Sequence, residues 1–178
     1  FTVGYLGAVG PDKGLIYLLQ AWKKLNYPDA SLRIAGRDST SPLVCHLLKH
    51  FGGGNVELVG WVDSAWDFYD SLSLYVQPSV TEGFGIEVLE SLARGRPVVC
   101  SDGAGAKDVI RLDFDPTGSV VKARDVDAMA DAIEHWKDGY DPKDLTWESI
   151  TSSCRGEAED YTWDKIRARY VDLWKGLP

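Results

Sequence analysis

Apolar residues along the chain alternate between short runs of strand composition and longer stretches with helical spacing. Residues 2–6 (TVGYL) predict a strand, and four apolar residues on one helical face predict a helix after Gly14. Further strands are predicted at 31–36, 56–60, 72–78, 97–102 and 118–121. Helical segments are predicted at 42–51, at 65–72, from within 81–90 to about Arg94, at 105–110 and at 125–136.

This order of elements predicts an α/β fold, a Rossmann-like parallel sheet of about six strands with helices on both faces. Residues 140–178 carry no strand pattern and are expected to form a helical tail of the same single domain, 1–178. The final helix, over 162–177, has an apolar stripe whose aromatic residues are expected to pack within the tail. These are Trp163, Tyr170 and Trp174.

Ligands of such sheets bind beyond the carboxyl ends of the strands. Five glycine-rich or charged loops follow predicted strands and therefore converge on that edge. They are 7–14 (GAVGPDKG), 36–41 (GRDSTS), 60–64 (GWVDS), 78–85 (PSVTEGFG) and 101–108 (SDGAGAKD). Their convergence predicts a nucleotide-type binding domain.

Composition narrows the class of partner. The 178 residues carry 27 acidic and 19 basic side chains, a formal net charge of −8, which argues against nucleic acid or an anionic membrane as the main partner. No apolar run approaches the roughly 18 residues of a membrane-spanning helix. Cys45, Cys100 and Cys154 are interpreted as reduced core residues of a cytoplasmic protein. Because the chain begins inside a strand-like run, we expect a piece of a longer protein.

Two of the loops contain candidate chemistry. Lys13 stands at a predicted helix start after Gly7 and Gly10, where free N–H groups favour a phosphate. The spacing matches neither the P-loop nor the dinucleotide fingerprint, and a tight turn with an exposed lysine is the alternative. In 81–90 (TEGFGIEVLE), bare glycine backbone at a helix start stands between Glu82 and Glu90.

Ionised carboxylates are strong acceptors for sugar and ribose hydroxyls. Glu82 and Glu90 could therefore bind the hydroxyls of a ligand in the cleft. The alternative is structural: Glu82 caps the helix, and Glu90 pairs with Arg94 one turn later.

Residues 81–102 (TEGFGIEVLESLARGRPVVCSD) resemble the signature of the retaining GT-B glycosyltransferases, which include glycogen synthases, sucrose synthases and phosphatidylinositol mannosyltransferases. Two glutamates with seven residues between them are the hallmark of that family. The resemblance extends over nearly the whole chain, from 3–14 (VGYLGAVGPDKG) through 32–36 and 56–62 to the tail at 161–174. It implies one half of a GT-B fold, the C-terminal nucleotide-sugar-binding domain, with the N-terminal acceptor domain absent.

The resemblance also implies a role for each matching residue. Lys13 would contact the donor diphosphate, Glu82 would bind sugar hydroxyls and Glu90 would hold the ribose diol. Val62 would border the base. Backbone contacts to sugar and phosphate would come from Gly7, Gly83, Phe84, Gly85 and Ile86. Chemistry without a metal or other cofactor is expected, with a nucleotide sugar as the donor.

One position departs from the family pattern. Many members carry an arginine directly after the first glycine of the opening loop, where this chain has Ala8. The diphosphate would lose a cation there, and Arg37 in the neighbouring loop is a candidate replacement.

Other motifs imitate metal sites. The DFD of 113–115 and the DVD of 125–127 resemble a metal-binding Asp-x-Asp, but Asp125 is expected to cap a helix. His46 and His50, one helical turn apart, could ligate zinc, but the sequence offers no evident third ligand.

The resulting hypothesis is the donor domain of a retaining glycosyltransferase that moves a sugar to an acceptor hydroxyl, inactive without its other half. A non-catalytic nucleotide-binding module is the alternative, to which Ala8 gives weight. A sugar-nucleotide epimerase-like domain fits the glutamate motif less well.

Overall fold

Six parallel strands form one sheet in the computed structural model, which describes residues 1–112 and 116–177. The strand order is β3-β2-β1-β4-β5-β6. Strands β2 and β3 are added on one side of β1, and β4, β5 and β6 on its other side, so the order of the strands switches between β1 and β4. The strands are β1 (Thr2–Leu6), β2 (Ser31–Ala35), β3 (Val56–Gly60), β4 (Leu74–Gln77), β5 (Val98–Ser101) and β6 (Gly118–Val121). The predicted α/β, Rossmann-like class with six strands is confirmed.

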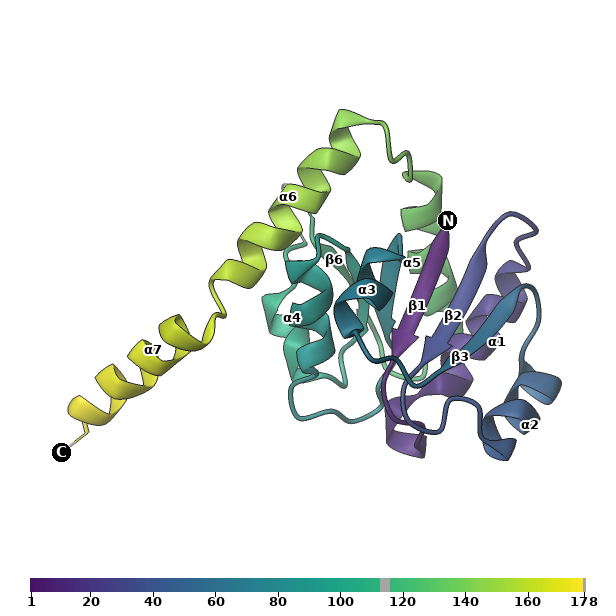
Figure 1. Cartoon of the computed structure of the whole chain (residues 1–178), viewed down its shortest axis with the longest axis horizontal. Helices are drawn as coiled ribbons and strands as arrows, with labels where there is room; N and C mark the ends of the chain where they lie inside the picture. The colour runs from purple at the N-terminus through teal and green to yellow at the C-terminus, as the bar shows by residue number, and fades with distance from the viewer. Residues whose placement is uncertain (113–115, 178) are drawn as a thin grey trace.

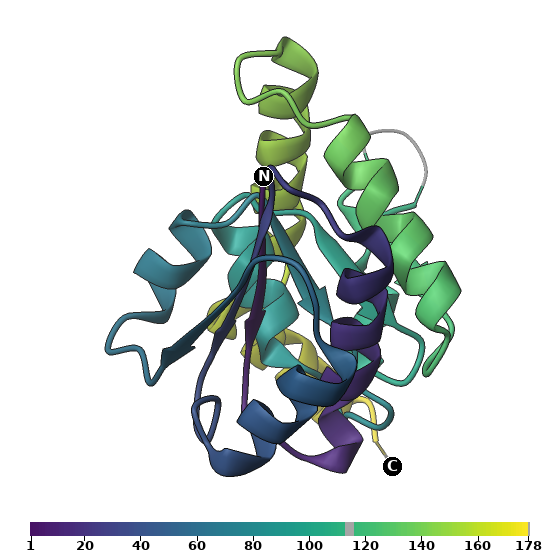
Figure 2. The ribbon, with the colours of Figure 1, turned by 90° about the vertical axis from the view of Figure 1, so that its right-hand side faces the viewer.

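Helices cover both faces of the sheet (Figures 1 and 2). One face carries α1 (Leu15–Leu25), α2 (Pro42–Phe51) and α5 (Val126–Asp138). The other carries α3 (Ala65–Asp70), α4 (Ile86–Ala93) and the 3₁₀ segment η2 (Gly105–Val109). A second 3₁₀ segment, η1 (Pro11–Lys13), precedes α1.

Alternation along the strands divides the core into two layers, because successive side chains point to opposite faces. In β4, Leu74 and Val76 pack toward α1 and α5, whereas Tyr75 packs toward α3 and α4. All three are fully buried. Burial on both faces explains why the sequence shows near-continuous apolar runs at β4 and β5.

The C-terminal arm consists of α6 (Leu145–Glu159) and α7 (Trp163–Lys175). Cys154 of α6 is buried in the layer that contains α4. At the end of α4, a Cβ on Gly95 would lie 2.5 Å from Cγ2 of Thr151, so the two helices fit closely. Figure 1 shows α7 continuing away from the sheet.

The prediction that the aromatic residues of the last helix pack within the tail is wrong. Trp163, Tyr170 and Trp174 are 81%, 55% and 66% exposed. Helical periodicity shows which residues share a face, but not whether another element covers that face. The core prediction also fails at Cys45, which is exposed, while Cys100 and Cys154 are buried. The preceding residue of α2, Val44, faces the sheet, so Cys45 is turned outward.

Two loops at the carboxyl edge are joined through their backbones. The carbonyl of Asp12 accepts hydrogen bonds from the N–H of Val80 at 2.7 Å and of Thr81 at 3.3 Å. Next to it, Gly14 adopts a left-handed conformation (φ 68°), and a Cβ there would lie 1.9 Å from the carbonyl oxygen of Pro78. Only a residue without a side chain permits this approach.

We expect Gly14→Ala to destabilise the fold by at least about 2 kcal/mol, from left-handed strain of about 1–2 kcal/mol and the clash with the Pro78 carbonyl. Urea unfolding followed by tryptophan fluorescence measures the change. Gly83→Ala is the matched control in the glutamate loop, residues 78–85. No heavy atom lies within 4 Å of a Cβ built at Gly83, so this substitution should change the free energy of unfolding by no more than about 0.5 kcal/mol. Equal stabilities of the two variants would contradict the role given to Gly14.

Candidate functional site

Lys13 and Glu82 form an ion pair at the carboxyl edge of the sheet. Lys13 ends η1 and Glu82 lies in the loop after β4, so the joined loops bring together residues distant in the sequence. Both side chains are mostly buried, with 23% and 18% exposed. The hydrogen bond to Glu82 raises the pKa of Lys13. The predicted phosphate cation and the predicted hydroxyl acceptor therefore share one position.

The glutamate loop is held by backbone hydrogen bonds to the segment after β5. The N–H of Glu82 donates to the carbonyl of Gly103 at 2.9 Å, and the N–H of Ala106 donates to that of Phe84 at 2.8 Å. A Cβ on Gly105 would lie 2.4 Å from the carbonyl oxygen of Gly83. The sequence placed both glycine-rich loops at this edge, but their backbone contacts could not be predicted from it.

The helix that follows begins at a glycine. Gly85, with φ 94°, is the N-cap of α4, and no side chain caps this helix start. The alternative prediction that Glu82 caps the helix is therefore wrong. Helix starts carry N–H groups without intrahelical partners, together with partial positive charge. Gly85 and Ile86 place these groups beside Glu82.

Glu90 lies in the second turn of α4 and is partly buried. The hydroxyl of Tyr69 on α3 donates to Oε2 of Glu90 at 2.9 Å. Burial raises the pKa of Glu90, the Tyr69 hydrogen bond opposes this shift, and the charge of Glu87 adds to it. Glu87 also contributes to the raised pKa of Lys13, so it lies within electrostatic reach of both groups.

The alternative prediction that Glu90 pairs with Arg94 is wrong. The guanidinium of Arg94 binds the carboxylate of Asp70 on α3, with Nε 2.9 Å from Oδ1 and a second contact from Nη2 to Oδ2. A tertiary partner has replaced the local one.

A groove of about 650 Å³ runs between α4 and the arm and contains three of the predicted residues: Phe84, Ile86 and Glu90. Trp66 of α3 and Tyr170 of α7 also contribute to it. Phe84 and Ile86 are exposed, so both residues are accessible from the groove.

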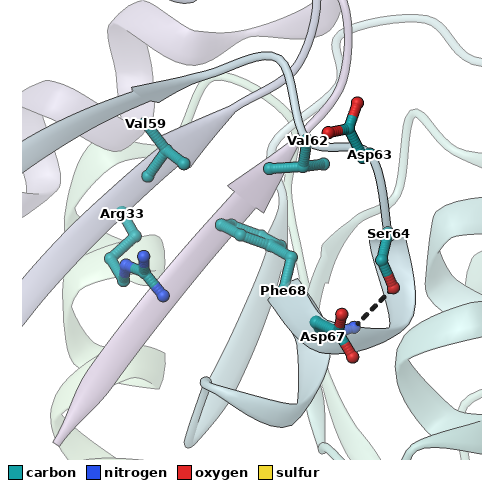
Figure 3. A pocket seen from close by; sticks show the side chains of 7 residues that line it. All are labelled: Arg33, Val59, Val62, Asp63, Ser64, Asp67 and Phe68. Carbon is teal, nitrogen blue, oxygen red and sulfur yellow. Dashed lines mark hydrogen bonds between the residues drawn. The ribbon is translucent and has the colours of Figure 1, made fainter.

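Val62 lines a separate hollow of about 340 Å³ between β3 and α3 (Figure 3). Figure 3 shows Val59 and Arg33 on one side and Asp63, Ser64 and Asp67 on the other, with the Phe68 ring between them. The guanidinium of Arg33 lies 5.6 Å from the centre of the Phe68 ring. Asp67 and Phe68 contribute to this hollow and Trp66 to the other, so α3 borders both.

The first loop is fixed by Tyr5, whose hydroxyl donates to the carbonyl of Ala8 at 2.7 Å. The side chain of Ala8 is exposed. Gly36 packs directly against the backbone of Gly7, where a Cβ would lie 2.3 Å from the Gly7 carbonyl oxygen. Arg37 follows Gly36 and is exposed, so the candidate replacement cation stands beside the loop that lacks its arginine.

The metal-like motifs resolve differently. Asp125 caps α5, as predicted, by accepting from the N–H of Ala128 at 2.9 Å. Residues 113–115 lie outside the described residues. The rings of His46 and His50 are 4.1 Å apart, but over residues 1–112 and 116–177 no cluster of three or more His, Cys, Asp or Glu side chains could hold a metal ion.

The sequence interpretation missed Tyr69 as a site residue. It belongs to a helix of mixed apolar and acidic residues, AWDFYD, and nothing in its spacing relates it to a glutamate 21 positions later. The signal that identifies it is its full burial, which the structure gives and the sequence does not, since a buried tyrosine hydroxyl needs a partner.

Comparison with known proteins decides the family. Residues 1–147 match the family described as glycosyl transferases group 1. The chain belongs to this family. The resemblance drawn from the glutamate motif is thereby confirmed at the level of the family.

Two relatives and one solved structure show what this group 1 glycosyltransferase chain is similar to. An uncharacterized glycosyltransferase of Methanocaldococcus jannaschii is 31% identical over 96% of this chain and 44% of its own length. A glycogen synthase of Alkalilimnicola ehrlichii is 27% identical over 99% of this chain and 37% of its own. The structure of HepE of Anabaena in complex with UDP and glucose matches with a TM-score of 0.80 at 18% identity, over 99% of this chain and 48% of that one.

The chain thus spans less than half the length of each of these relatives. The likeness to the solved structure shows the fold. Within residues 1–112 and 116–177, every helix is too short or too polar to cross a membrane.

We expect Glu90→Gln to raise the melting temperature by about 1–3 °C at about pH 8. A carboxyl whose pKa is raised in the folded state binds its proton more tightly there, so ionising it as the pH rises through that pKa costs stability. Below the ordinary pKa of a glutamate both forms are neutral, and the advantage should vanish.

Calorimetric scans of both proteins between about pH 4 and pH 8 measure this difference. Glu148→Gln, at an exposed glutamate of α6, is the control and should give no such gain. A melting temperature of Glu90→Gln that falls below that of the unchanged chain at about pH 8 would contradict the burial cost assigned to Glu90.

Proposed function

We propose that the chain is the C-terminal, donor-binding half of a retaining glycosyltransferase, which transfers a sugar from a nucleoside diphosphate to an acceptor hydroxyl. The observation that carries the proposal is the meeting of Lys13 and Glu82 beside the glycine-lined start of α4. A cation, a carboxylate and helix-start N–H groups at one point are the groups that a sugar diphosphate requires.

The chemistry follows from the charges that develop during transfer. As the bond to the sugar breaks, the diphosphate gains negative charge and the sugar becomes oxocarbenium-like. Lys13 and the N–H groups of the α4 start stabilise the leaving diphosphate electrostatically. Glu82 accepts hydrogen bonds from the sugar hydroxyls and orients the sugar, a role that does not require it to act as nucleophile.

The remaining residues hold the nucleoside. Glu90 accepts the two ribose hydroxyls, and Val62 borders the base. Backbone groups of Gly7 and of Gly83–Ile86 contact phosphate and sugar. The roles need no metal ion. Support comes from the relatives: one is a glycogen synthase, and the Anabaena structure contains UDP and glucose.

The acceptor site and any acid–base group belong, in this proposal, to an N-terminal half, because the relatives are about twice as long as this chain or longer. The chain alone is expected to show no significant turnover. A non-catalytic nucleotide-binding module remains the second candidate, favoured by the exposed Ala8 where many members carry arginine.

The test is calorimetric titration of the chain with UDP, GDP and ADP. We expect saturable binding of one nucleotide, weakened roughly tenfold or more by Lys13→Ala and by Glu90→Ala, since each removes a charged partner. Lys49→Ala, at an exposed lysine of α2, is the matched control and should bind as the unchanged chain does. Binding that is insensitive to Lys13 and Glu90 would contradict the proposal.

The ion pair makes a further prediction about Glu82. In the free protein the carboxylate of Glu82 is paired with the ammonium group of Lys13, so a diphosphate must compete with Glu82 for that cation. We expect Glu82→Gln to bind the bare nucleoside diphosphate up to about tenfold more tightly and to lose the added affinity that the sugar gives to the nucleotide sugar.

Titration of Glu82→Gln with the nucleotide and its sugar conjugate measures both changes. Glu87→Gln, in the first turn of α4, is the control for loss of one negative charge nearby. Equal weakening of both ligands by Glu82→Gln would exclude competition between Glu82 and the diphosphate for Lys13.

A further inference from the structure

Tyr69 is a fully buried side chain that touches the candidate site with one atom. Its ring is fixed between two aromatic neighbours: the centre of the Phe68 ring lies 6.2 Å away and that of Tyr75 lies 5.6 Å away, both edge to face. Such contacts hold a ring in one orientation. Only its hydroxyl reaches the site, 2.9 Å from Oε2 of Glu90.

The hydroxyl is a permanent donor to this carboxylate. Burial and the charge of Glu90 raise the pKa of Tyr69 well above its usual value, so the group stays protonated. Among the described residues, it is the one hydrogen-bond donor that reaches the Glu90 carboxylate. An ionised carboxylate offers about four acceptor positions on its two oxygens. One bond to Oε2 therefore fixes the plane of the group and leaves positions for two more hydroxyls.

The rest of the surroundings would not orient Glu90. It lines the groove with apolar side chains such as Leu89 and Trp66, and the nearby Glu87 is also negative. The cation one turn away, Arg94, is held by Asp70. Without Tyr69, the carboxylate would be partly buried and free to rotate.

We propose that Tyr69 is a positioning residue, whose hydroxyl holds the Glu90 carboxylate in the orientation that accepts both ribose hydroxyls of a nucleoside diphosphate. The inference rests on the proposed function, since it takes Glu90 to be the ribose-binding group. It assigns to α3 a part in donor binding through a residue outside the glutamate motif.

The test compares the affinities of Tyr69→Phe and of the unchanged chain for two ligands. The first is whichever of UDP, GDP and ADP binds the unchanged chain, and the second is the 2′,3′-dideoxy analogue of that nucleotide. We expect Tyr69→Phe to weaken binding of the ribose nucleotide about tenfold (1.4 kcal/mol) and of the dideoxy analogue less than about twofold. The analogue lacks both hydroxyls, so it cannot report on the orientation of Glu90. A general loosening of the fold would weaken both ligands equally.

Two further readouts separate positioning from packing. In the Glu90→Gln background, adding Tyr69→Phe should cost little more, because the two residues act through one bond. The pH below which binding is lost should be higher in Tyr69→Phe, since the hydrogen bond that lowers the pKa of Glu90 is gone. The other ionisable groups around Glu90 are unchanged in this comparison; they are Glu87, Tyr161 and Tyr170.

Tyr75→Phe is the matched control. Tyr75 is equally buried, and its hydroxyl donates to Oε1 of Gln77 at 2.5 Å and lies 3.1 Å from the carbonyl oxygen of Leu6. Loss of this hydroxyl should lower the free energy of unfolding without changing the ratio of affinities for the ribose and dideoxy nucleotides.

The outcomes separate the two claims. If Glu90→Gln selectively weakens the ribose nucleotide but Tyr69→Phe weakens both ligands equally, or neither, the positioning role is overturned and the proposed function stands. If no nucleotide binds, or if Glu90→Gln leaves ribose binding unchanged, the proposed function fails and the inference fails with it.

Discussion

The structure depends on the contact between the backbone at Gly14 and the carbonyl of Pro78. This contact, with the hydrogen bonds that Asp12 accepts from Val80 and Thr81, sets the distance between the two loops that carry Lys13 and Glu82. The two loops follow β1 and β4, which are neighbours in the sheet although 67 residues separate Leu6 from Leu74. The nearness of Lys13 and Glu82 thus rests on contacts between main-chain atoms, which no side chain has to supply.

The two glutamates of the motif are held by different physical means. Glu82 forms an ion pair with Lys13, whereas Glu90 is partly buried beside a neutral hydroxyl that offsets only part of the cost of its charge. In the first arrangement, Lys13 and Glu82 are held in position by binding each other. The second places a carboxylate in partly buried surroundings that solvate its charge poorly, where an added hydroxyl donor is most favourable.

Much of the fold could be predicted from the sequence, because strand alternation and helical spacing are local properties. The edge that collects the loops followed from the parallel sheet alone, and the nearness of Lys13 and Glu82 followed from that edge. Contacts made across the fold could not be predicted. Arg94 takes Asp70 rather than Glu90, and Tyr69 reaches Glu90 from another helix, because tertiary packing selects among partners that sequence spacing leaves equivalent.

The fit of α6 against the end of α4, through Thr151 and Gly95, joins the C-terminal arm to the helix that starts at the carboxyl edge of the sheet. The same short helix has Glu90 in its second turn and begins where the glutamate loop ends, at Gly85. The packing of α6 on α4 therefore connects the C-terminal arm to the helix that carries Glu90.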